Sequence, residues 1–212
     1  TPVTCGIDLE TFSPKNDGEY LRKRYAIPKD KPVLLYVGRL DAEKRIEQVI
    51  EASAKAMKQA NFSLVIGGKG FEAKNLQKLA KKLGIDNKVF FTGFVPDEDL
   101  PSLYAIADCF ANACPFELQC RVGTEAMARG LPIVAGNAGA LPQLVENNSN
   151  GLLFEPGNIL TITKHIVDMM SDEEKRHNMG KESLRLIKTH GIDTMIEQYL
   201  AIYEQSIKHK NR

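Results

Sequence analysis

The sequence has almost no net charge, no long apolar run and few cysteines. Its 28 Lys and Arg residues nearly balance its 27 Asp and Glu residues, which leaves a net charge of +1. Such a balance provides no bulk attraction to nucleic acid, so we expect no nucleic-acid partner. No apolar run approaches the roughly 18 residues of a membrane span. The first residues show no secretion-signal pattern, and we therefore expect a cytoplasmic location.

Cysteine and histidine give no sign of a metal site. The cysteines Cys109, Cys114 and Cys120 follow a C-x4-C-x5-C spacing that matches no standard zinc motif, and no His lies nearby. The acidic run 97–99 superficially resembles a D-x-D metal motif, but it follows Pro96 at a predicted helix start, where acidic side chains favour the helix dipole. We predict reduced thiols, helix capping by the acidic run, and no essential metal or other cofactor.

Apolar runs alternate with helical patterns along most of the chain. The predicted strands are 33–37, 62–66, 88–92, 109–112, 131–135 and 151–154, and the main predicted helices are 42–59, capped by Asp41, then 72–83, 97–106, one around Glu125, and 159–208. Strands that are apolar on both faces and separated by helices indicate a parallel sheet covered on both sides. We predict an α/β fold, a Rossmann-like doubly wound sheet of about six strands, with ligands beyond the carboxyl ends of the strands.

The segment Pro115–Ala135 sets two carboxylates, Glu117 and Glu125, eight positions apart. Pro115 disfavours helix just before it, which places Glu117 on a loop. Glu125 is predicted in the first turn of the helix that ends at Gly130. A loop carboxylate and a helix carboxylate that face one cleft suit the hydroxyls of a sugar and a ribose. Two solvated glutamates are the alternative.

A basic turn follows the first predicted strand. Gly38 allows close approach of the backbone to a ligand, and Arg39 and Lys44 flank the start of the next helix. A guanidinium, an ammonium and a helix N-terminus together suit a diphosphate without a metal. The alternative is a pair of solvated cations, although cations at a helix N-terminus are mildly unfavourable.

The strings G-R-L-x-x-E-K at Gly38–Lys44 and E-x7-E at Glu117–Glu125 resemble the signatures of retaining glycosyltransferases of the GT-B fold, family 4. The resemblance implies that Arg39 and Lys44 hold the donor diphosphate and stabilise the leaving nucleotide. It implies that Glu125 holds the ribose, and that Glu117, with the backbone of Leu118, Gln119 and Cys120, holds the donor sugar. It further implies front-face attack, in which the leaving phosphate takes the acceptor's proton and Glu117 is not a nucleophile.

Three further loops resemble the family with departures. The loop containing Phe94 and Val95 corresponds to the one whose backbone reads the nucleobase, or it is an ordinary strand end. The run Gly67–Gly70 is interpreted mainly as a structural turn, with Phe71 replacing the usual Pro. After the fifth strand, the usual G-G-x-x-E becomes Gly139–Gln143. Leu118, Gln119 and Cys120 replace commoner G-F-G-like residues, so donor specificity is expected there.

The resemblance also predicts a division of the chain. Residues 1–14 resemble an interdomain segment, residues 15–190 form the nucleotide-sugar-binding domain, and residues 191–212 form a helix that packs toward an N-terminal domain. The chain starts with Thr1, and we expect that the acceptor-binding domain is missing. We expect the partners to be a UDP- or GDP-sugar and that missing domain, which alone would provide any peripheral membrane association. Such a fragment would bind donor but transfer little hexose.

Two other functions fit the alternating pattern. One is half of a nonhydrolysing sugar-nucleotide epimerase, which shares the GT-B architecture. The other is a dinucleotide-binding module of an oxidoreductase, but the run Gly67–Gly70 does not complete G-x-G-x-x-G. The two signature strings favour the glycosyltransferase.

Overall fold

The computed structural model describes residues 3 and 5–210. Six parallel strands form one sheet in the order β3-β2-β1-β4-β5-β6. The strands are β1 (Val33–Val37), β2 (Ser63–Gly67), β3 (Val89–Gly93), β4 (Cys109–Asn112), β5 (Ile133–Gly136) and β6 (Gly151–Phe154). This is the doubly wound order, which confirms the predicted Rossmann-like α/β fold.

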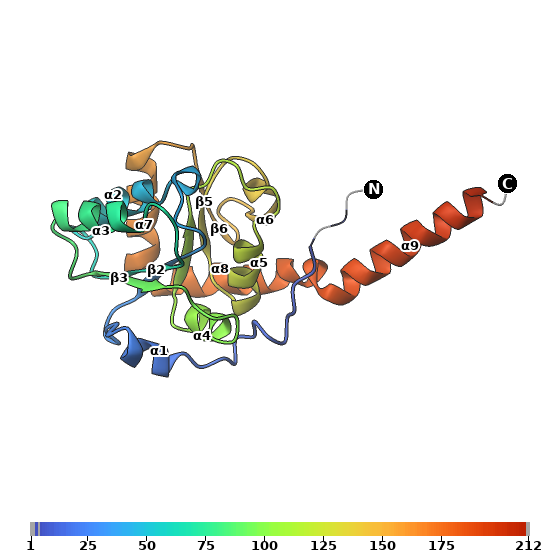
Figure 1. Cartoon of the computed structure of the whole chain (residues 1–212), viewed down its shortest axis with the longest axis horizontal. Coiled ribbons are helices and arrows are strands. Elements are labelled where there is room, and N and C mark those ends of the chain that lie inside the picture. Colours follow the sequence, from blue (N-terminus) through green and yellow to red (C-terminus); the bar gives the residue numbers. More distant parts are fainter. Residues whose placement is uncertain (1–2, 4, 211–212) are drawn as a thin grey trace.

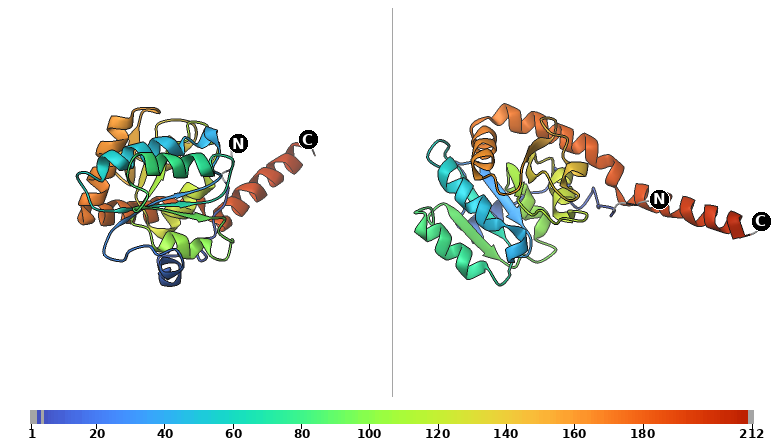
Figure 2. Two further views of the ribbon diagram at one scale, coloured as in Figure 1. Left: turned by 60° about the vertical axis from the view of Figure 1, so that its left-hand side comes forward. Right: turned by 90° about the horizontal axis from the view of Figure 1, so that it is seen from above.

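Helices cover both faces of the sheet, as Figures 1 and 2 show. Side chains of α2, α3 and α7 join one hydrophobic cluster, and side chains of α1, α4 and α5 join the other. Helix α8 packs on α5 and α7. The helices are α1 (Glu19–Arg24), α2 (Ile46–Ala56), α3 (Ala73–Lys82), α4 (Leu100–Ala105), α5 (Arg121–Arg129), α6 (Leu141–Leu144), α7 (Ile159–Ser171), α8 (Glu173–Leu186) and α9 (Ile192–Lys210), with 3-10 turns η1 (Ala42–Lys44) and η2 (Ile187–His190).

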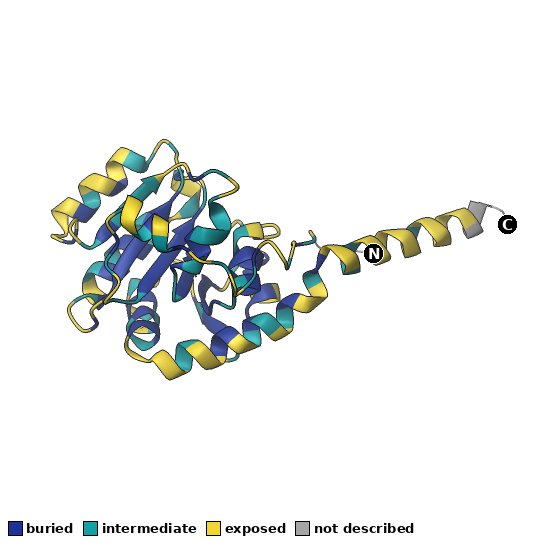
Figure 3. Ribbon diagram, turned by 90° about the horizontal axis from the view of Figure 1, so that it is seen from below, coloured by how far each residue is buried: buried dark blue, intermediate teal, exposed yellow. Residues whose placement is uncertain are grey.

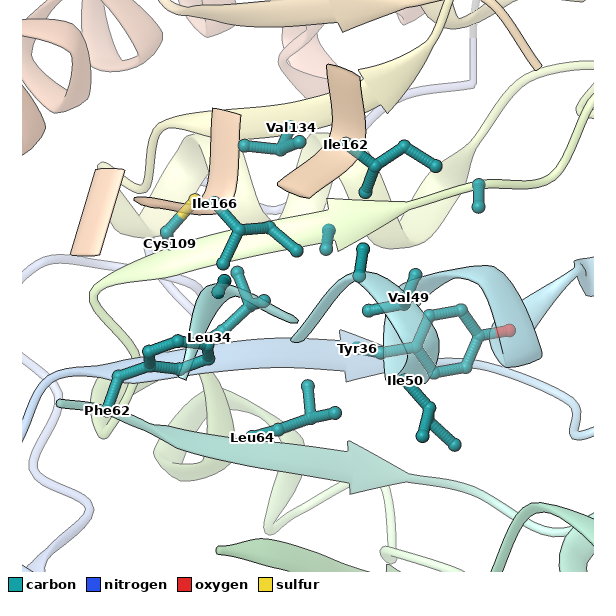
Figure 4. Packing of buried hydrophobic residues seen from close by; sticks show 14 of the residues in the cluster. Leu34, Tyr36, Val49, Ile50, Phe62, Leu64, Cys109, Val134, Ile162 and Ile166 are labelled. Atoms are coloured by element: carbon teal, nitrogen blue, oxygen red, sulfur yellow. The ribbon is translucent and has the colours of Figure 1, made fainter. Parts of the chain in front are cut away.

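The central strands are buried on both faces because their side chains alternate between two apolar layers. Leu34 and Tyr36 pack under α2 and α7 (Figure 4), whereas Val33 and Leu35 pack in the opposite cluster. Burying such a side chain contributes about 1.5–3 kcal/mol. The uninterrupted apolar run of β1 therefore has no solvent face, and its position in the middle of the sheet follows from the sequence.

Some predicted elements differ from the structure. The predicted helix 42–59 is broken at Arg45, whose φ of 53° separates η1 from α2. Asp41 makes no capping hydrogen bond, because its carboxylate accepts from the Arg39 guanidinium and the Phe71 amide. The late helix is broken at Asp172, which caps α8 by accepting from the Lys175 amide. Helix α1 was not predicted.

The acidic run was predicted to cap the helix after it, and this was wrong. Helix α4 begins at Leu100, and its N-cap residue Asp99 makes no side-chain capping hydrogen bond. The Asp99 carboxylate instead accepts from the Tyr20 hydroxyl and the Arg24 guanidinium. Asp99 therefore links α1 to the start of α4.

The N-terminal segment lies beside the start of α9. The Ile7 amide donates to the His190 carbonyl at 2.8 Å, and the Ile192 amide donates to the Ile7 carbonyl at 3.2 Å. From there α9 extends away from the body of the molecule and is largely exposed (Figure 3). Its apolar side chains Ile196, Leu200, Tyr203 and Ile207 are all exposed. In the predicted segment 1–14, residues 1, 2 and 4 lie outside the described residues.

Candidate functional site

The site lies at the carboxyl ends of β1 and β4, which are neighbours in the sheet. Beyond β1 the chain crosses to one face of the sheet, and beyond β4 it crosses to the other, so the switch point of the sheet, where ligands of such folds bind, lies between these two loops. Lys44, in η1 after β1, and Glu117, after β4, meet at this switch point. Their Nζ and Oε1 atoms are 2.9 Å apart, although 73 positions separate the residues.

The Lys44–Glu117 pair is half-buried and part of a small network. The Lys44 and Glu117 side chains are 18% and 13% exposed. Asn112 Nδ2 donates to the same Glu117 Oε1 at 3.3 Å and to Cys120 Sγ at 3.3 Å. Burial lowers the pKa of Lys44, but the hydrogen bond and charge of Glu117 raise it more, so the net shift is upward. The switch point therefore holds a fixed ammonium at neutral pH.

Glu125 lies one turn further into its helix than predicted, because α5 begins at Arg121. The carboxylate is only 4% exposed. Tyr104 donates its hydroxyl to Oε2 at 2.8 Å, and Arg121 Nε lies 3.2 Å from Oε1. Burial above all raises the pKa of Glu125. Glu117 and Glu125 thus have separate partners rather than forming one acid pair.

A pocket of about 300 Å³ opens beside the basic turn. Loops after β1, β2 and β3 line it, and they bring together four predicted residues: Gly38, Arg39, Phe94 and Val95. The Phe94 ring is 61% exposed, and Lys69 Nζ lies 4.7 Å from its centroid. An exposed aromatic ring beside cations is a surface on which a base can stack.

Backbone contacts hold these loops together. The Gly38 amide donates to the Gly67 carbonyl at 3.0 Å, and the Gly68 amide donates to the Gly93 carbonyl at 2.8 Å. Gly68 has a φ of +134°, and a Cβ there would lie 1.8 Å from the Gly38 oxygen. Only glycine fits that contact, which supports the structural interpretation of the Gly67–Gly70 turn.

Arg39 lines the pocket, but its guanidinium is paired with two carboxylates of its own turn. Its guanidinium donates to Asp41 at 2.7 Å and also to Glu43. The Arg39 side chain is 66% exposed. Exposed ion pairs of this kind contribute about 0–1 kcal/mol, so this guanidinium can exchange partners at little cost.

The departures from the family glycines lie at a second, smaller pocket of about 170 Å³. Leu118 and Gln119 line it, together with Gln143, and Cys5 Sγ donates to Gln119 Oε1 at 2.6 Å. Cys120 is buried with a φ of 46°, a conformation that glycine adopts more readily. Burial above all raises the pKa of the Cys120 thiol to about 12. This thiol is therefore a packing group.

Sequence reasoning missed three site residues. Asn112 is the polar residue that ends β4, and its position at the carboxyl end of a predicted strand was a usable signal. Lys69 lies within the glycine turn that was interpreted as structural. Tyr104 is buried, and only the packing of α4 against α5 brings it to Glu125.

A larger concavity lies elsewhere on the described part of the chain. It measures about 650 Å³ and runs along α8, between residues such as Asn148, Lys175 and Glu182. Its lining mixes acidic and basic side chains at the surface, and none of the predicted site residues contributes to it. We therefore assign the site by the chemistry that converges at β1 and β4 rather than by size.

Among the described residues, no cluster of three or more His, Cys, Asp or Glu side chains is arranged to hold a metal ion. Over the same residues, no helix has both the length and the apolar character needed to cross a bilayer.

Known proteins resemble this chain over most of its length. The spore coat protein SA of Bacillus subtilis is 32% identical over 96% of this chain and 58% of its own length. A GDP-mannose-dependent alpha-(1-6)-phosphatidylinositol monomannoside mannosyltransferase of Mycolicibacterium smegmatis is 32% identical over 82% of this chain and 48% of its own length. The chain therefore spans about half the length of these curated relatives.

Solved structures also resemble this chain over most of its length. Sucrose-phosphate synthase from Thermosynechococcus elongatus superposes with a TM-score of 0.86 at 25% identity, over 98% of this chain and 52% of that one. Anabaena HepE in complex with UDP superposes with a TM-score of 0.82 at 25% identity, over 94% of this chain and 56% of that one. The family described as "Glycosyl transferases group 1" matches residues 17–186. The chain thus belongs to the glycosyl transferases group 1 family and has the fold of the nucleotide-sugar-binding half of a GT-B enzyme.

Proposed function

We propose that this chain is the donor-binding half of a retaining family 4 glycosyltransferase that transfers a hexose from a nucleotide diphosphate sugar. The observation that carries the proposal is the Lys44–Glu117 pair between the carboxyl ends of β1 and β4, together with the Phe94 pocket, which Gly38 and Arg39 of the same basic turn line. The printed names of similar proteins support it, since one mannosyltransferase is GDP-mannose-dependent and one structure is a UDP complex.

The two basic residues of the turn would hold the diphosphate. Lys44 is already charged and partly desolvated beside Glu117. Arg39, whose guanidinium is exposed, would leave its partners Asp41 and Glu43, because a diphosphate offers two or more charged oxygens to its planar fork. Cations fixed where negative charge develops on the leaving nucleotide lower the transition-state energy.

Glu117 would position the ammonium and contact the donor sugar. Its Oε1 accepts from both Lys44 and Asn112, an arrangement suited to holding groups rather than to attack on carbon. We therefore assign no nucleophile to this chain. Attack by the acceptor from the leaving-group face, with the departing phosphate taking the acceptor's proton, retains the anomeric configuration.

Glu125 would hold the ribose hydroxyls. Its Oε2 stays with Tyr104, while Oε1 pairs with Arg121. The Arg121 side chain is exposed, so ribose hydroxyls can replace it at little cost. Hydrogen bonds from hydroxyls to a carboxylate are charge-assisted and therefore strong, particularly in a buried site.

The acceptor would bind to a separate domain. Residues 1–14 and 191–212 would connect to that domain, and the apolar face of α9 would pack against it. The full-length enzyme would act in the cytoplasm without an essential metal, and any membrane association would come through the other domain. The chain on its own would bind donor and transfer little hexose.

A thermal-shift screen against UDP-, GDP- and ADP-sugars tests the proposal. A ligand at 100 times its Kd stabilises the folded state by about 2.7 kcal/mol, or roughly 5–11 °C in Tm. We expect at least one of these donors to produce such a shift, and NADH to produce none. A protein that NADH stabilises and no nucleotide sugar stabilises would contradict the proposal. Efficient transfer by this chain alone would contradict only the assignment of the acceptor site.

A further inference from the structure

Asp97 is an acidic residue in the lining of the Phe94 pocket, together with Val95 and Leu100. Among residues 3 and 5–210, no hydrogen bond or ion pair engages the Asp97 side chain, whereas Asp99, two positions along, is bonded to both Tyr20 and Arg24. The capping role predicted for Asp97 therefore does not account for it, and an acceptor-only group is left at the pocket wall.

The opposite chemistry comes from Lys69. Lys69 lines the same pocket, and its ammonium lies 4.7 Å from the Phe94 ring centroid. An ammonium donates hydrogen bonds and accepts none. The pocket thus combines a stacking ring, one donor-only group and one acceptor-only group. At about 300 Å³ it falls at the lower end of small-molecule sites, a size suited to one nucleobase.

These groups do not suit the common bases equally. Guanine offers adjacent donors, N1–H and the N2 amino group, to a carboxylate, and it offers O6 and N7 as acceptors to an ammonium. Uracil has a single N–H donor between two carbonyl oxygens, so one carboxylate oxygen would face a carbonyl. Adenine presents N1, an acceptor, beside its amino group. Guanine alone gives the carboxylate two charge-assisted hydrogen bonds.

The charge of Asp97 also acts on Glu125, the residue proposed to hold the ribose. Burial, and to a smaller extent the charge of Asp97, raise the pKa of Glu125. This effect of Asp97 is the smallest of those acting on Glu125, and it has the sign expected of a second carboxylate.

We propose that the donor is a guanosine diphosphate sugar and that Asp97 is the residue that selects guanine. This inference rests on the proposed function, because it assumes that the Phe94 pocket holds the base of the donor.

The test is titration calorimetry of GDP and UDP against the wild-type chain, Asp97→Asn and Glu98→Gln. Glu98 is exposed one position along and lies outside the residues that line the pocket, so Glu98→Gln removes the same charge as a matched control. We expect the wild type to bind GDP about tenfold more tightly than UDP, and Asp97→Asn to lose about tenfold in GDP affinity with little change for UDP. Glu98→Gln should match the wild type.

Two results would overturn the inference while leaving the donor site intact. One is a wild-type preference for UDP. The other is an Asp97→Asn variant whose GDP-to-UDP ratio equals that of the wild type. A folded wild-type chain that binds neither nucleotide would overturn both the inference and the proposed function, which distinguishes the two failures.

Discussion

The two ends of the proposed donor groove are built differently. At the diphosphate end, Lys44 and Glu117 are half-buried and joined at 2.9 Å across the switch point of the sheet. At the base end, the ring of Phe94 is mostly exposed, and Asp97 is exposed on a loop. The first end depends on the sheet order, while the second depends on individual loop residues.

This difference separates what the fold requires from what a substrate requires. Every nucleotide diphosphate sugar carries the same diphosphate, so its site can be fixed by the sheet. Bases differ, and a loop residue such as Asp97 can change without disturbing β1 or β4. Changes at the diphosphate end should therefore affect all donors equally, and changes at the base end should alter the choice between donors.

Gly68→Ala breaks the contact that joins the two ends and should have the largest effect. The new Cβ would lie 1.8 Å from the Gly38 carbonyl oxygen. We expect a loss of about 3 kcal/mol or more, which lowers Tm by roughly 6–12 °C. Gly84→Ala is the control, because its φ is also positive but no atom lies within 4 Å. Equal Tm losses in the two variants would contradict the tight packing of these loops.

Lys44→Ala tests the diphosphate end directly. Removing one member of a desolvated charge pair costs about 2–5 kcal/mol in binding, and because this pair is partly exposed we expect the lower end, a loss of about thirtyfold in affinity. Calorimetry should find the same factor for GDP and UDP. Lys55→Ala, at an exposed position of α2, serves as the control. A loss confined to one nucleotide would contradict the division between the two ends.

Arg39→Ala should have a smaller effect on affinity and almost none on stability. Its side chain is 66% exposed in both of its ion pairs, so Tm should stay within about 1–2 °C of the wild type, while affinity for both nucleotides falls about tenfold. Arg185→Ala, which likewise removes an exposed guanidinium with two carboxylate partners, should change neither quantity. An unaltered affinity in Arg39→Ala would remove Arg39 from the site.

Glu125→Gln should raise stability slightly and weaken binding. Because the folded-state pKa of Glu125 is raised above its ordinary value, mainly by burial, the ionised carboxylate costs stability at neutral pH. Replacing it should add about 1 kcal/mol or less at pH 7. The difference in Tm between Glu125→Gln and the wild type should grow as pH rises from the ordinary carboxyl pKa through that raised pKa. It should vanish below the ordinary value. A gap of constant size across this range would show that the charge is not responsible.

Much of the fold could be predicted because the central strands are uniformly apolar. The predicted bounds 33–37, 109–112 and 151–154 coincide with β1, β4 and β6. The break at Arg45 could not be predicted, since its left-handed backbone follows from the fit of η1 and α2 onto the sheet rather than from residue type. Helix α1 was missed because its six residues bury only Leu21, too little for a periodic pattern.

Some contacts of the predicted site residues follow from the strand order, whereas others depend on how the helices pack. The structure brings Lys44 to Glu117, and it brings Gly38 to Phe94 and Val95. Those pairings follow from the rule that carboxyl ends of parallel strands share one edge. The bond between Tyr104 and Glu125 depends on how α4 packs against α5, which no motif in the sequence encodes. Residue roles in donor binding remain predictions.

Amide chemical-shift mapping by NMR, with GDP and UDP added in turn, tests the central claim most directly. The account predicts that the largest shifts fall in the loops after β1, β3 and β4, over residues 38–44, 93–97 and 117–125, and that Lys44→Ala strongly reduces them at a nucleotide concentration near the wild-type Kd. Shifts gathered instead along the α8 concavity of Asn148, Lys175 and Glu182 would contradict it.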